Sequence, residues 1–457
     1  MSPVYEVEVR RRSLGELARV LTPEQADRLR AVAARSATTL SGRTVWNVNS
    51  TATGGGVAEM LHSLLGYVVD AGVRSRWLVL TGDPLFFGLT KRLHNAIHGA
   101  VEDHTPADAD RSHYEEVLRR NLPALLDLVG PQDVVILHDP QTAGLVVPLL
   151  QVGIPVVWRC HIGRDSPNAT SEAAWDFLRP YVEPVDVAVF SRRQYAPAWL
   201  APDRIRVIPP SIDPLSEKNR PMERADRLRI LVRAGLLAGG GATEPHGAVR
   251  STPPPPAEAR LVVQVSRWDR LKDMAGVILG FAGAPVPDDV HLMLVGPDVA
   301  GVADDPESAD VLAECRATWQ HLPSRLRERV HLASVPMADP EKNARIVNAI
   351  QRHASVVCQK SLAEGFGLTV TEAMWKARPV VATAVGGIQD QVHDGEDGLL
   401  IKDPYDLRAL GDAVARLLTD PALAHRLGEA AHRTVRSRFL GDRHLEQYAD
   451  LLASVLG

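Results

Sequence analysis

One stretch, residues 359–377, constrains the fold of this chain more than any other. It follows a short apolar run at 354–358, contains the glycines Gly365 and Gly367, and ends in apolar residues that recur at helical spacing. Glycine lets the backbone turn sharply and approach a ligand closely. The pattern predicts a strand, a glycine loop and a helix N-terminus, whose free amides and dipole favour a bound phosphate.

Two carboxylates, Glu364 and Glu372, frame this loop with seven residues between them. On the predicted helix Glu372 lies opposite the apolar stripe, so we expect it to face away from the packed core. A carboxylate accepts two hydroxyl hydrogen bonds, so a pair of them around a phosphate site suits a sugar nucleotide. An ordinary helix with a solvated glutamate and a glycine turn is the alternative, and the Gly-Phe-Gly sequence favours the ligand site.

The segment Glu364-Gly-Phe-Gly-Leu-x3-Glu372 resembles the Glu-x7-Glu motif of family 4 of the retaining GT-B glycosyltransferases, which includes sucrose and trehalose synthases. The resemblance implies an α/β fold of two Rossmann-like domains, whose parallel sheets face each other across a cleft. It also implies that Glu364 lies near the transferred sugar and that Glu372 holds the nucleotide ribose. The loop residues that would bind the donor are Gly365, Phe366, Gly367 and Leu368.

The overall composition excludes several other classes of protein. At 457 residues the chain needs two or three domains. A net charge of −5 gives no footprint for nucleic acid or an acidic membrane. The three cysteines, Cys160, Cys315 and Cys358, form no Cys-x-x-Cys, which argues against disulfides and structural zinc. No apolar run has the length of a signal peptide or a membrane span, so we expect a cytoplasmic protein. Together with the charge and the cysteines, this predicts a reduced protein that has small-molecule substrates and no nucleic acid or membrane partner.

A second strand, glycine loop and helix unit is predicted near the N-terminus. Residues 44–50 alternate as a strand, and three glycines then open a helical pattern. The loop is not Gly-x-Gly-x-x-Gly, so a dinucleotide site is weakly supported. Asn49-Ser-Thr-Ala-Thr-Gly-Gly-Gly-Val-Ala-Glu-Met60 resembles the N-terminal loop of the trehalose glycosyltransferring synthases. That resemblance implies that Gly54 borders the acceptor and that Gly55 and Gly56 border the donor phosphates; a glycine turn without a ligand is the alternative.

Strands and helices alternate through the rest of the first domain, which predicts a parallel sheet with helices on both faces. The expected strands are 76–80, 133–137, 155–159, 185–190 and 204–208. Ligands sit beyond the strand C-termini of such sheets, where 138–141 and 159–163 fall. A lone histidine is more often a core or surface residue, but the resemblance implies that His161 contacts the donor sugar. It likewise implies that Asp139 and Gln141 belong to the acceptor rim.

Proline-rich stretches mark the predicted domain boundaries. Clustered prolines at 209–214 cannot continue a central strand, so residues 1–220, with an N-terminal extension, are expected to form the acceptor domain. Residues 221–259 are interpreted as a linker whose Pro- and Gly-rich insert, 237–258, forms a mobile loop. Residues 260–430 would form the nucleotide-sugar domain, and the resemblance implies that a helix in 431–457 crosses back towards the first domain.

A predicted buried strand at 260–265 delivers Arg267 to its C-terminal end, and Lys272 follows at the start of a helix. Two fixed cations near a diphosphate stabilise the charge that grows as the bond to the sugar breaks, although exposed charge is the alternative for an isolated pair. Ser266-Arg-x4-Lys-Asp273 resembles the family's diphosphate clamp, and Gly386-Gly387 resembles another turn beside the donor. No Asp-x-Asp pair follows a strand, so we expect no metal and no other cofactor.

Among its relatives the chain most resembles synthases that join a nucleoside-diphosphate glucose to free glucose. We therefore expect a hexosyltransferase that moves α-glucose reversibly and with retention to give trehalose. Its catalytic residues would be Arg267, Lys272, Glu364 and His161. The alternatives are a trehalose phosphorylase, a transferase with another acceptor and a non-catalytic sugar-nucleotide sensor. The nucleobase, the acceptor, a homodimeric state, the role of 237–258 and the physiological direction stay open at this point.

Overall fold

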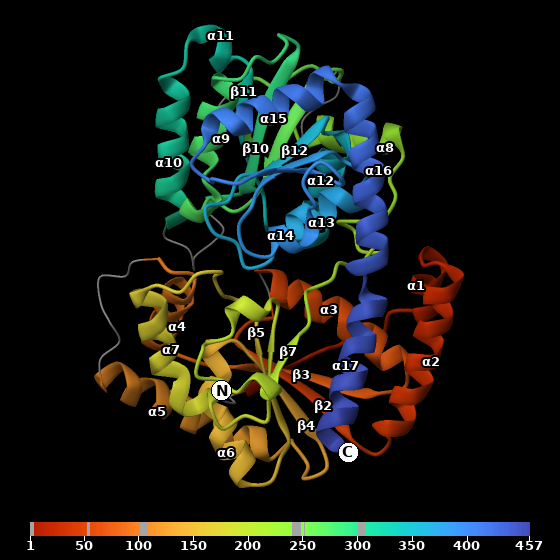
Figure 1. Ribbon diagram of the computed structural model, residues 1–457, viewed down its shortest axis with the longest axis vertical. Coiled ribbons are helices and arrows are strands. Elements are labelled where there is room, and N and C mark those ends of the chain that lie inside the picture. Colours follow the sequence, from red (N-terminus) through yellow and green to blue (C-terminus); the bar gives the residue numbers. More distant parts are fainter. Residues whose placement is uncertain (1–3, 53–54, 101–107, 240–247, 251, 300–306) are drawn as a thin grey trace. The chain divides into compact units, whose positions relative to one another are not determined.

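The computed structural model describes residues 4–52, 55–100, 108–239, 248–250, 252–299 and 307–457 (Figure 1). The chain divides into two compact units, Met1–Asp213 with Phe439–Gly457, and Pro214–Arg438. The expected acceptor domain ends at 220 and the expected C-terminal segment begins at 431, whereas the first unit ends at Asp213 and resumes at Phe439, and the expected linker 221–259 falls within the second unit. Each unit contains its own seven-stranded sheet, and we describe each unit separately.

The N-terminal sheet has the strand order β1-β3-β2-β4-β5-β6-β7. Its strands are β1 (Val4–Val7), β2 (Thr44–Asn49), β3 (Arg74–Leu80), β4 (Val134–His138), β5 (Val156–Cys160), β6 (Val187–Phe190) and β7 (Ile205–Val207). All neighbouring strands are parallel except β1, which pairs antiparallel with β3 at the edge. The parallel sheet predicted from the alternating pattern is therefore confirmed.

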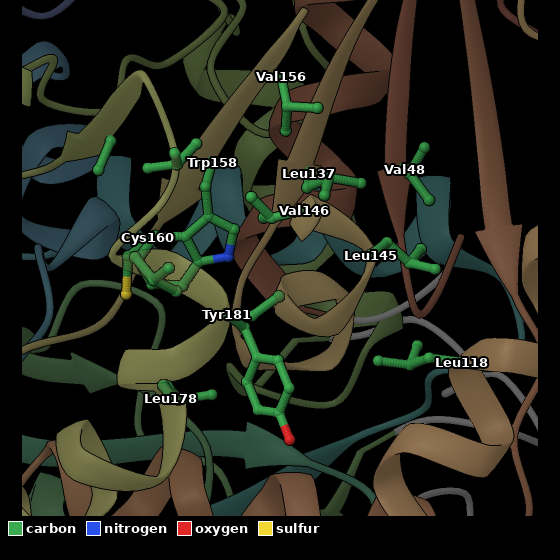
Figure 2. Close-up of a cluster of buried hydrophobic side chains, with 14 of the residues drawn as sticks. Val48, Leu118, Leu137, Leu145, Val146, Val156, Trp158, Cys160, Leu178 and Tyr181 are labelled. Atoms are coloured by element: carbon green, nitrogen blue, oxygen red, sulfur yellow. The ribbon is translucent and has the colours of Figure 1, made fainter. Parts of the chain in front are cut away.

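Helices cover both faces of this sheet. They are α1 (Leu14–Val20), α2 (Pro23–Thr39), α3 (Gly55–Asp70), α4 (Pro84–Ile97), α5 (Asp108–Leu126), α6 (Val146–Gln151), α7 (Ala169–Val182) and α17 (Gly441–Leu456). Because side chains alternate along a strand, Leu137 and Trp158 pack into one core, shown in Figure 2, and Ile136 and Val157 pack into a second core. The second core also contains Leu451 of α17.

The C-terminal sheet has the order β14-β13-β12-β9-β10-β11-β8. Its strands are β8 (Val249–Arg250), β9 (Arg260–Val265), β10 (Val290–Pro297), β11 (Val330–Val335), β12 (Val356–Gln359), β13 (Val380–Thr383) and β14 (Leu399–Ile401). Its helices are α8 (Arg224–Arg233), α9 (Met274–Ala282), α10 (Glu307–Gln320), α11 (Ser324–Arg327), α12 (Pro340–His353), α13 (Leu368–Trp375), α14 (Ile388–Gln391), α15 (Leu407–Thr419) and α16 (Pro421–Arg438). Only β8 runs antiparallel to its neighbour.

Strand order reverses once in each sheet, and these reversals locate the candidate sites. In the C-terminal sheet the chain builds outward from β9 through β10 to β11 and then restarts on the other side of β9 with β12. In the N-terminal sheet β3 lies on one side of β2 and β4 on the other. Ligands of open parallel sheets bind beyond the strand C-termini at such a reversal. Both glycine loops and the candidate side chains follow these strands.

The segment interpreted as a linker is more ordered than its composition predicts. It contains α8, which packs against α12, and Leu231, Leu236 and Leu237 are buried there. Farther along, β8 extends the sheet beside β11. Residues 240–247 and 251 of the segment predicted to form a mobile loop lie outside the described residues, and its mobility stays a prediction. The apolar side chains that flank the Gly- and Pro-rich core supply the burial that the prediction overlooked.

Two further features bear on the expected class of protein. Cys160, Cys315 and Cys358 are buried free thiols. Across the described residues, no helix has both the length and the apolar character that crossing a membrane requires.

Candidate functional site

Lys272 and Glu364 are far apart in the sequence and meet at the strand reversal of the C-terminal sheet. Lys272 ends the turn that follows β9, and Glu364 lies in the loop that follows β12. The Lys272 Nζ is 2.6 Å from the Glu364 Oε2, and the Ser361 hydroxyl donates to the same oxygen at 3.2 Å. Both side chains keep a partly exposed surface, 15% and 12%. The pair therefore presents a cation and a carboxylate to the crevice where this topology binds ligands.

Gln264 fixes the backbone that carries Lys272. This β9 side chain is fully buried, and its Nε2 donates to the Lys272 carbonyl oxygen at 2.8 Å. Its Oε1 accepts from the backbone N–H of Lys360 at 2.9 Å. The backbone N–H of Leu362 also donates to the Leu271 carbonyl, at 2.7 Å. These hydrogen bonds join the loops after β9 and β12, so the position of Lys272 relative to Glu364 depends on them.

A second ion pair, between Lys360 and Asp273, also joins the loops after β9 and β12. Asp273 adopts a left-handed backbone conformation with φ 39° and caps α9 by accepting from the Gly276 N–H at 3.0 Å. The Lys360 side chain is 1% exposed, and burial lowers the pKa of Lys360 to about 8. Sequence reasoning missed both Lys360 and Gln264. The signal that could have found Gln264 is one amide in an otherwise apolar strand.

Arg267 follows the same strand as Lys272 but is much more exposed. Its side chain is 49% exposed, and its Nη2 lies 2.9 Å from the Asp269 Oδ2. The structure thus places both cations of the predicted clamp on one loop, with Lys272 held tightly and Arg267 at the surface.

The glycine loop after β12 depends on backbone geometry that only glycine allows. Gly367 is the N-terminal cap of α13 and has φ 87°, a left-handed conformation that L side chains rarely adopt. A side chain at Gly387 would come within 2.7 Å of the Phe366 Cα, so the predicted Gly386–Gly387 turn packs directly on this loop. Phe366 itself is 5% exposed. Its ring therefore packs against protein and supports the loop.

Glu372 departs from the expectation that it faces away from packed residues. It is 4% exposed, because the segment 214–220 covers that side of α13. Within that segment the carbonyl of Asn219 accepts from the Trp375 indole at 3.2 Å, and the Lys218 Nζ lies 3.6 Å from the Glu372 Oε1. Helical periodicity within 368–377 cannot reveal a cover supplied by a distant segment. Lys218 is a second cation that sequence reasoning missed.

In the N-terminal unit, His138 and His161 follow β4 and β5 and contact each other. The His161 Nε2 is 3.0 Å from the His138 Nδ1, and the His138 Nε2 is 3.1 Å from the Asn47 Oδ1. Burial and the charge of Arg159 lower the pKa of His138 to about 3, and burial, Arg159 and His138 hold the pKa of His161 well below its ordinary value. Both rings are therefore neutral. The Asn47 oxygen can only accept, so the His138 Nε2 carries the proton and donates to it. The His138 Nδ1 is then an acceptor, and it accepts from the His161 Nε2.

Asp139 ties these two loops together. Its backbone is left-handed, with φ 64°, and its Oδ1 accepts from the backbone N–H of His161 at 2.7 Å. Burial raises the pKa of Asp139 to about 7. The structure thus brings Asp139 and His161 together, and Gln141 lies on the turn that follows. Neighbouring Arg159, which is fully buried, was not predicted as a site residue.

The remaining predicted residues belong to the loop after β2. Gly54 lies outside the described residues. Gly55 begins α3, and Gly56 is exposed in its first turn. Among the residues that the structure describes, no group of three or more His, Cys, Asp or Glu side chains is arranged to hold a metal ion.

Comparisons with known protein families match both units. Residues 47–197 match a family described as trehalose synthase, N-terminal domain, and residues 249–434 match glycosyl transferases group 1. The chain is 36% identical to the trehalose synthase of Pyrococcus horikoshii, with 100% of both chains covered. It is 26% identical to the trehalose phosphorylase of Pleurotus pulmonarius, over 85% of this chain and 54% of that protein.

Solved structures show the same architecture at low sequence identity. The sucrose-phosphate synthase from Thermosynechococcus elongatus is 20% identical, with a TM-score of 0.65 over 90% of this chain and 98% of that one. Anabaena HepE in complex with UDP and glucose is 15% identical, with a TM-score of 0.63 over 90% of this chain and 100% of that one. The likeness identifies the fold as GT-B, built from two Rossmann-like domains.

Proposed function

This chain belongs to the trehalose synthase family of glycosyltransferases, and from that membership we propose that it transfers α-glucose from a nucleoside-diphosphate glucose to free glucose with retention, forming trehalose. The observation that carries the proposal is the contact between Lys272 and Glu364 at the strand reversal of the C-terminal sheet. A cation there stabilises a departing diphosphate, and a carboxylate accepts hydroxyl hydrogen bonds from a sugar.

In this proposal the C-terminal unit holds the donor. Lys272 and Arg267 contact the diphosphate, and the amides of 365–368 supply further donors for it. Glu372 binds the ribose hydroxyls, and the Lys218 Nζ lies 3.6 Å from that buried carboxylate. Support comes from the family match over 249–434, which contains all of these groups except Lys218.

The N-terminal unit supplies the groups for the sugars. Asp139, Gln141 and Gly54 are proposed to contact the acceptor, and His161 the donor sugar, with Gly55 and Gly56 near the donor phosphates. His161 suits this task because its neutral ring does not attract an anion, and its Nδ1, 3.5 Å from the Arg159 Nε, can accept a hydrogen bond from a hydroxyl. The family match over 47–197 contains all of these residues.

The proposed chemistry needs no enzymic nucleophile. The bond between glucose C1 and the diphosphate oxygen breaks, and the acceptor hydroxyl oxygen bonds to C1 on the same face. The acceptor proton passes to the departing phosphate oxygen, so trehalose and a nucleoside diphosphate are the products. Lys272 and Arg267 act as fixed positive charges throughout, and their positions support catalysis by charge stabilisation alone.

The test is product formation from UDP-, ADP- and GDP-glucose, each with glucose and with a panel of other sugars. We expect α,α-trehalose, identified by proton NMR, and an equal amount of nucleoside diphosphate with at least one donor. A product with a β-linkage, or no disaccharide with any donor, would contradict the proposal. Binding of a donor without turnover would instead indicate a sugar-nucleotide sensor.

Trehalose phosphorylase is the second candidate, because the match to the Pleurotus enzyme spans 85% of this chain. Trehalose and inorganic phosphate, supplied without nucleotide, separate the two. Only a phosphorylase then forms glucose 1-phosphate, whereas the proposed synthase requires a nucleoside diphosphate to cleave trehalose.

We also propose that no metal ion takes part, because the two cations already supply the charge that a metal would bring. Removing divalent ions with EDTA should leave the initial rate unchanged, and adding Mg²⁺ after dialysis should not raise it. A rate that falls about tenfold with EDTA and recovers with Mg²⁺ would show that a metal supports the leaving group.

A further inference from the structure

The N-terminal unit contains a cavity of about 90 Å³ that the candidate site does not use. It lies on the face of the sheet opposite the core of Figure 2, between β2, β3 and β4 below and the helices α2, α3 and α17 above. Most of its wall is aliphatic, and Leu29, Leu61, Leu64, Leu65 and Leu452 contribute to it. An aliphatic cavity of this size favours an apolar occupant over water.

One corner of the cavity is polar and incompletely hydrogen-bonded. His444 lines it, is 1% exposed, and has its Nδ1 3.0 Å from the Ser211 Oγ. Among the described residues its Nε2 has no hydrogen-bond partner. The Tyr448 ring stacks on His444, with ring centroids 5.1 Å apart, and also lines the cavity. Leaving a buried ring nitrogen unpaired is costly, so this nitrogen is a place for a ligand atom.

Several other polar groups in the wall already have protein partners. His138 uses both ring nitrogens, on His161 and Asn47, and the Ser75 hydroxyl donates to the Val45 carbonyl. A buried water needs two to four polar partners, which the aliphatic part of this wall does not offer. Water therefore cannot fill the cavity with its hydrogen bonds satisfied.

From this arrangement we propose that the cavity binds a compact alcohol, with its hydrocarbon body against the leucines and its hydroxyl on the His444 Nε2. Burial and the charge of Arg443 hold the pKa of His444 well below its ordinary value, so the ring is neutral. If the Ser211 hydroxyl donates to the Nδ1, the Nε2 carries the proton and is a donor; if the hydroxyl accepts, the Nε2 is an acceptor. An alcohol hydroxyl can pair with the Nε2 in either case. A cavity of about 150 Å³ holds benzene, so one of this size fits an alcohol of about five non-hydrogen atoms.

The occupant would touch residues connected to the candidate site. His138 forms part of the cavity wall and contacts His161 through its Nδ1. His444 contacts Ser211, which lies just before the end of the first segment of the N-terminal unit. The binding proposal itself is independent of the proposed reaction, because its test measures occupancy and not turnover.

The test is titration of the full chain, labelled on leucine and valine methyl groups, with isobutanol, and with glycerol as a polar control of similar size. Isobutanol should shift the methyl signals of Leu61, Leu64 and Leu452 in a saturable way, and glycerol should not. Leu410 and Leu417, buried in the C-terminal unit, serve as internal references and should not move. Shifts that never saturate, or that appear equally in both units, would overturn the proposal.

Matched variants locate the site. Ala449→Leu adds volume inside the cavity and should abolish saturable binding, whereas Ala453→Leu changes an exposed residue of the same helix and should leave binding intact. Ala33→Leu fills the cavity from α2, and it should also abolish saturable binding, so it replaces Ala449→Leu if that variant does not fold. His444→Phe should weaken isobutanol binding by about three- to tenfold, the loss expected for one hydrogen bond. Unchanged affinity in either filling variant would show that isobutanol binds elsewhere.

Discussion

The two sheets reverse their strand order in the same way but deliver different chemistry to the reversal. In the C-terminal unit the loops after β9 and β12 bring charged groups together, Lys272 with Glu364 and Lys360 with Asp273. In the N-terminal unit the loops after β4 and β5 bring together two neutral histidines, His138 and His161. The two units therefore share a topology at the reversal but place different side chains there.

Burial explains why the two loops differ in charge. Lys272 and Glu364 stay partly exposed and form an ion pair with each other. His138 is fully enclosed beside the buried Arg159, and its pKa falls to about 3. A charged crevice suits a diphosphate, and a neutral network suits sugar hydroxyls. The comparison predicts that charge changes matter most in the C-terminal unit and that changes in hydrogen bonding matter most in the N-terminal unit.

The largest expected effect comes from removing a cation in the C-terminal unit. Lys272→Ala or Arg267→Ala should lower kcat by roughly two orders of magnitude or more, because each cation is proposed to stabilise the leaving group. Steady-state kinetics with a saturating donor measures this. Arg408→Ala is the control, since this arginine of the same unit is 90% exposed and pairs only loosely with Asp412. Unchanged turnover in Lys272→Ala and Arg267→Ala would show that charge matters no more in the C-terminal crevice than in the N-terminal one.

The second prediction concerns the carboxyl group of the N-terminal unit. The pKa of Asp139 rises from 3.8 to about 7 on folding, so the folded state binds the proton more tightly than the unfolded state. The contribution of Asp139 to stability is therefore present at low pH and is lost as pH rises towards 7. Asp139→Asn keeps an oxygen for the His161 N–H and removes the titration. Relative to the wild type, the variant should gain on the order of 2 kcal/mol in unfolding free energy across this range.

Urea unfolding at several pH values measures that difference. Asp450→Asn is the control, because Asp450 is 64% exposed and its variant should differ from the wild type by a small and constant amount. A difference between Asp139→Asn and the wild type that does not change with pH would mean that Asp139 is charged in the folded state, and the N-terminal crevice would then not be neutral.

A third, smaller effect is expected from Gln264. Gln264→Glu keeps an oxygen for the Lys360 N–H but places a carboxylate oxygen against the Lys272 carbonyl, whereas Gln264→Met loses both hydrogen bonds. Both variants should lower kcat by about tenfold, because the loop carrying Lys272 loses its tether. Faster amide hydrogen exchange at 270–272 separates this positioning role from a general loss of stability. Wild-type kcat in both variants would show that Lys272 is held by its contact with Glu364 alone.

The sequence predicted the parts of this structure that depend on local pattern. The strand, glycine loop and helix around Gly365 and Gly367 are present as predicted. The glycine was a reliable signal because the turn requires a left-handed backbone at Gly367. The parallel order of the sheets followed from alternating strands and helices, and the meeting of Lys272 with Glu364 is consistent with both residues following neighbouring strands.

What the sequence could not predict depends on contacts between distant segments. Glu372 is buried because residues 214–220 cover α13, and no pattern within the helix encodes that cover. Gln264 and Lys360 act through loops that only the sheet order brings together. Likewise, α8 forms inside a segment whose composition predicted a linker, because a few leucines there find a buried surface.

Ionic strength should produce the smallest effect and the most direct comparison of the two crevices. Raising salt from about 0.05 to 0.5 M shortens the Debye length from about 14 to about 4 Å, which screens a partly exposed cation from a diphosphate. The KM for the nucleoside-diphosphate glucose should therefore rise about two- to fivefold, since Arg267 is 49% exposed. Glucose is uncharged, so screening should change its binding little and its KM should stay nearly constant. Initial rates at saturating co-substrate measure each KM, and equal rises in both would show that salt acts on the whole protein instead of on one charged crevice.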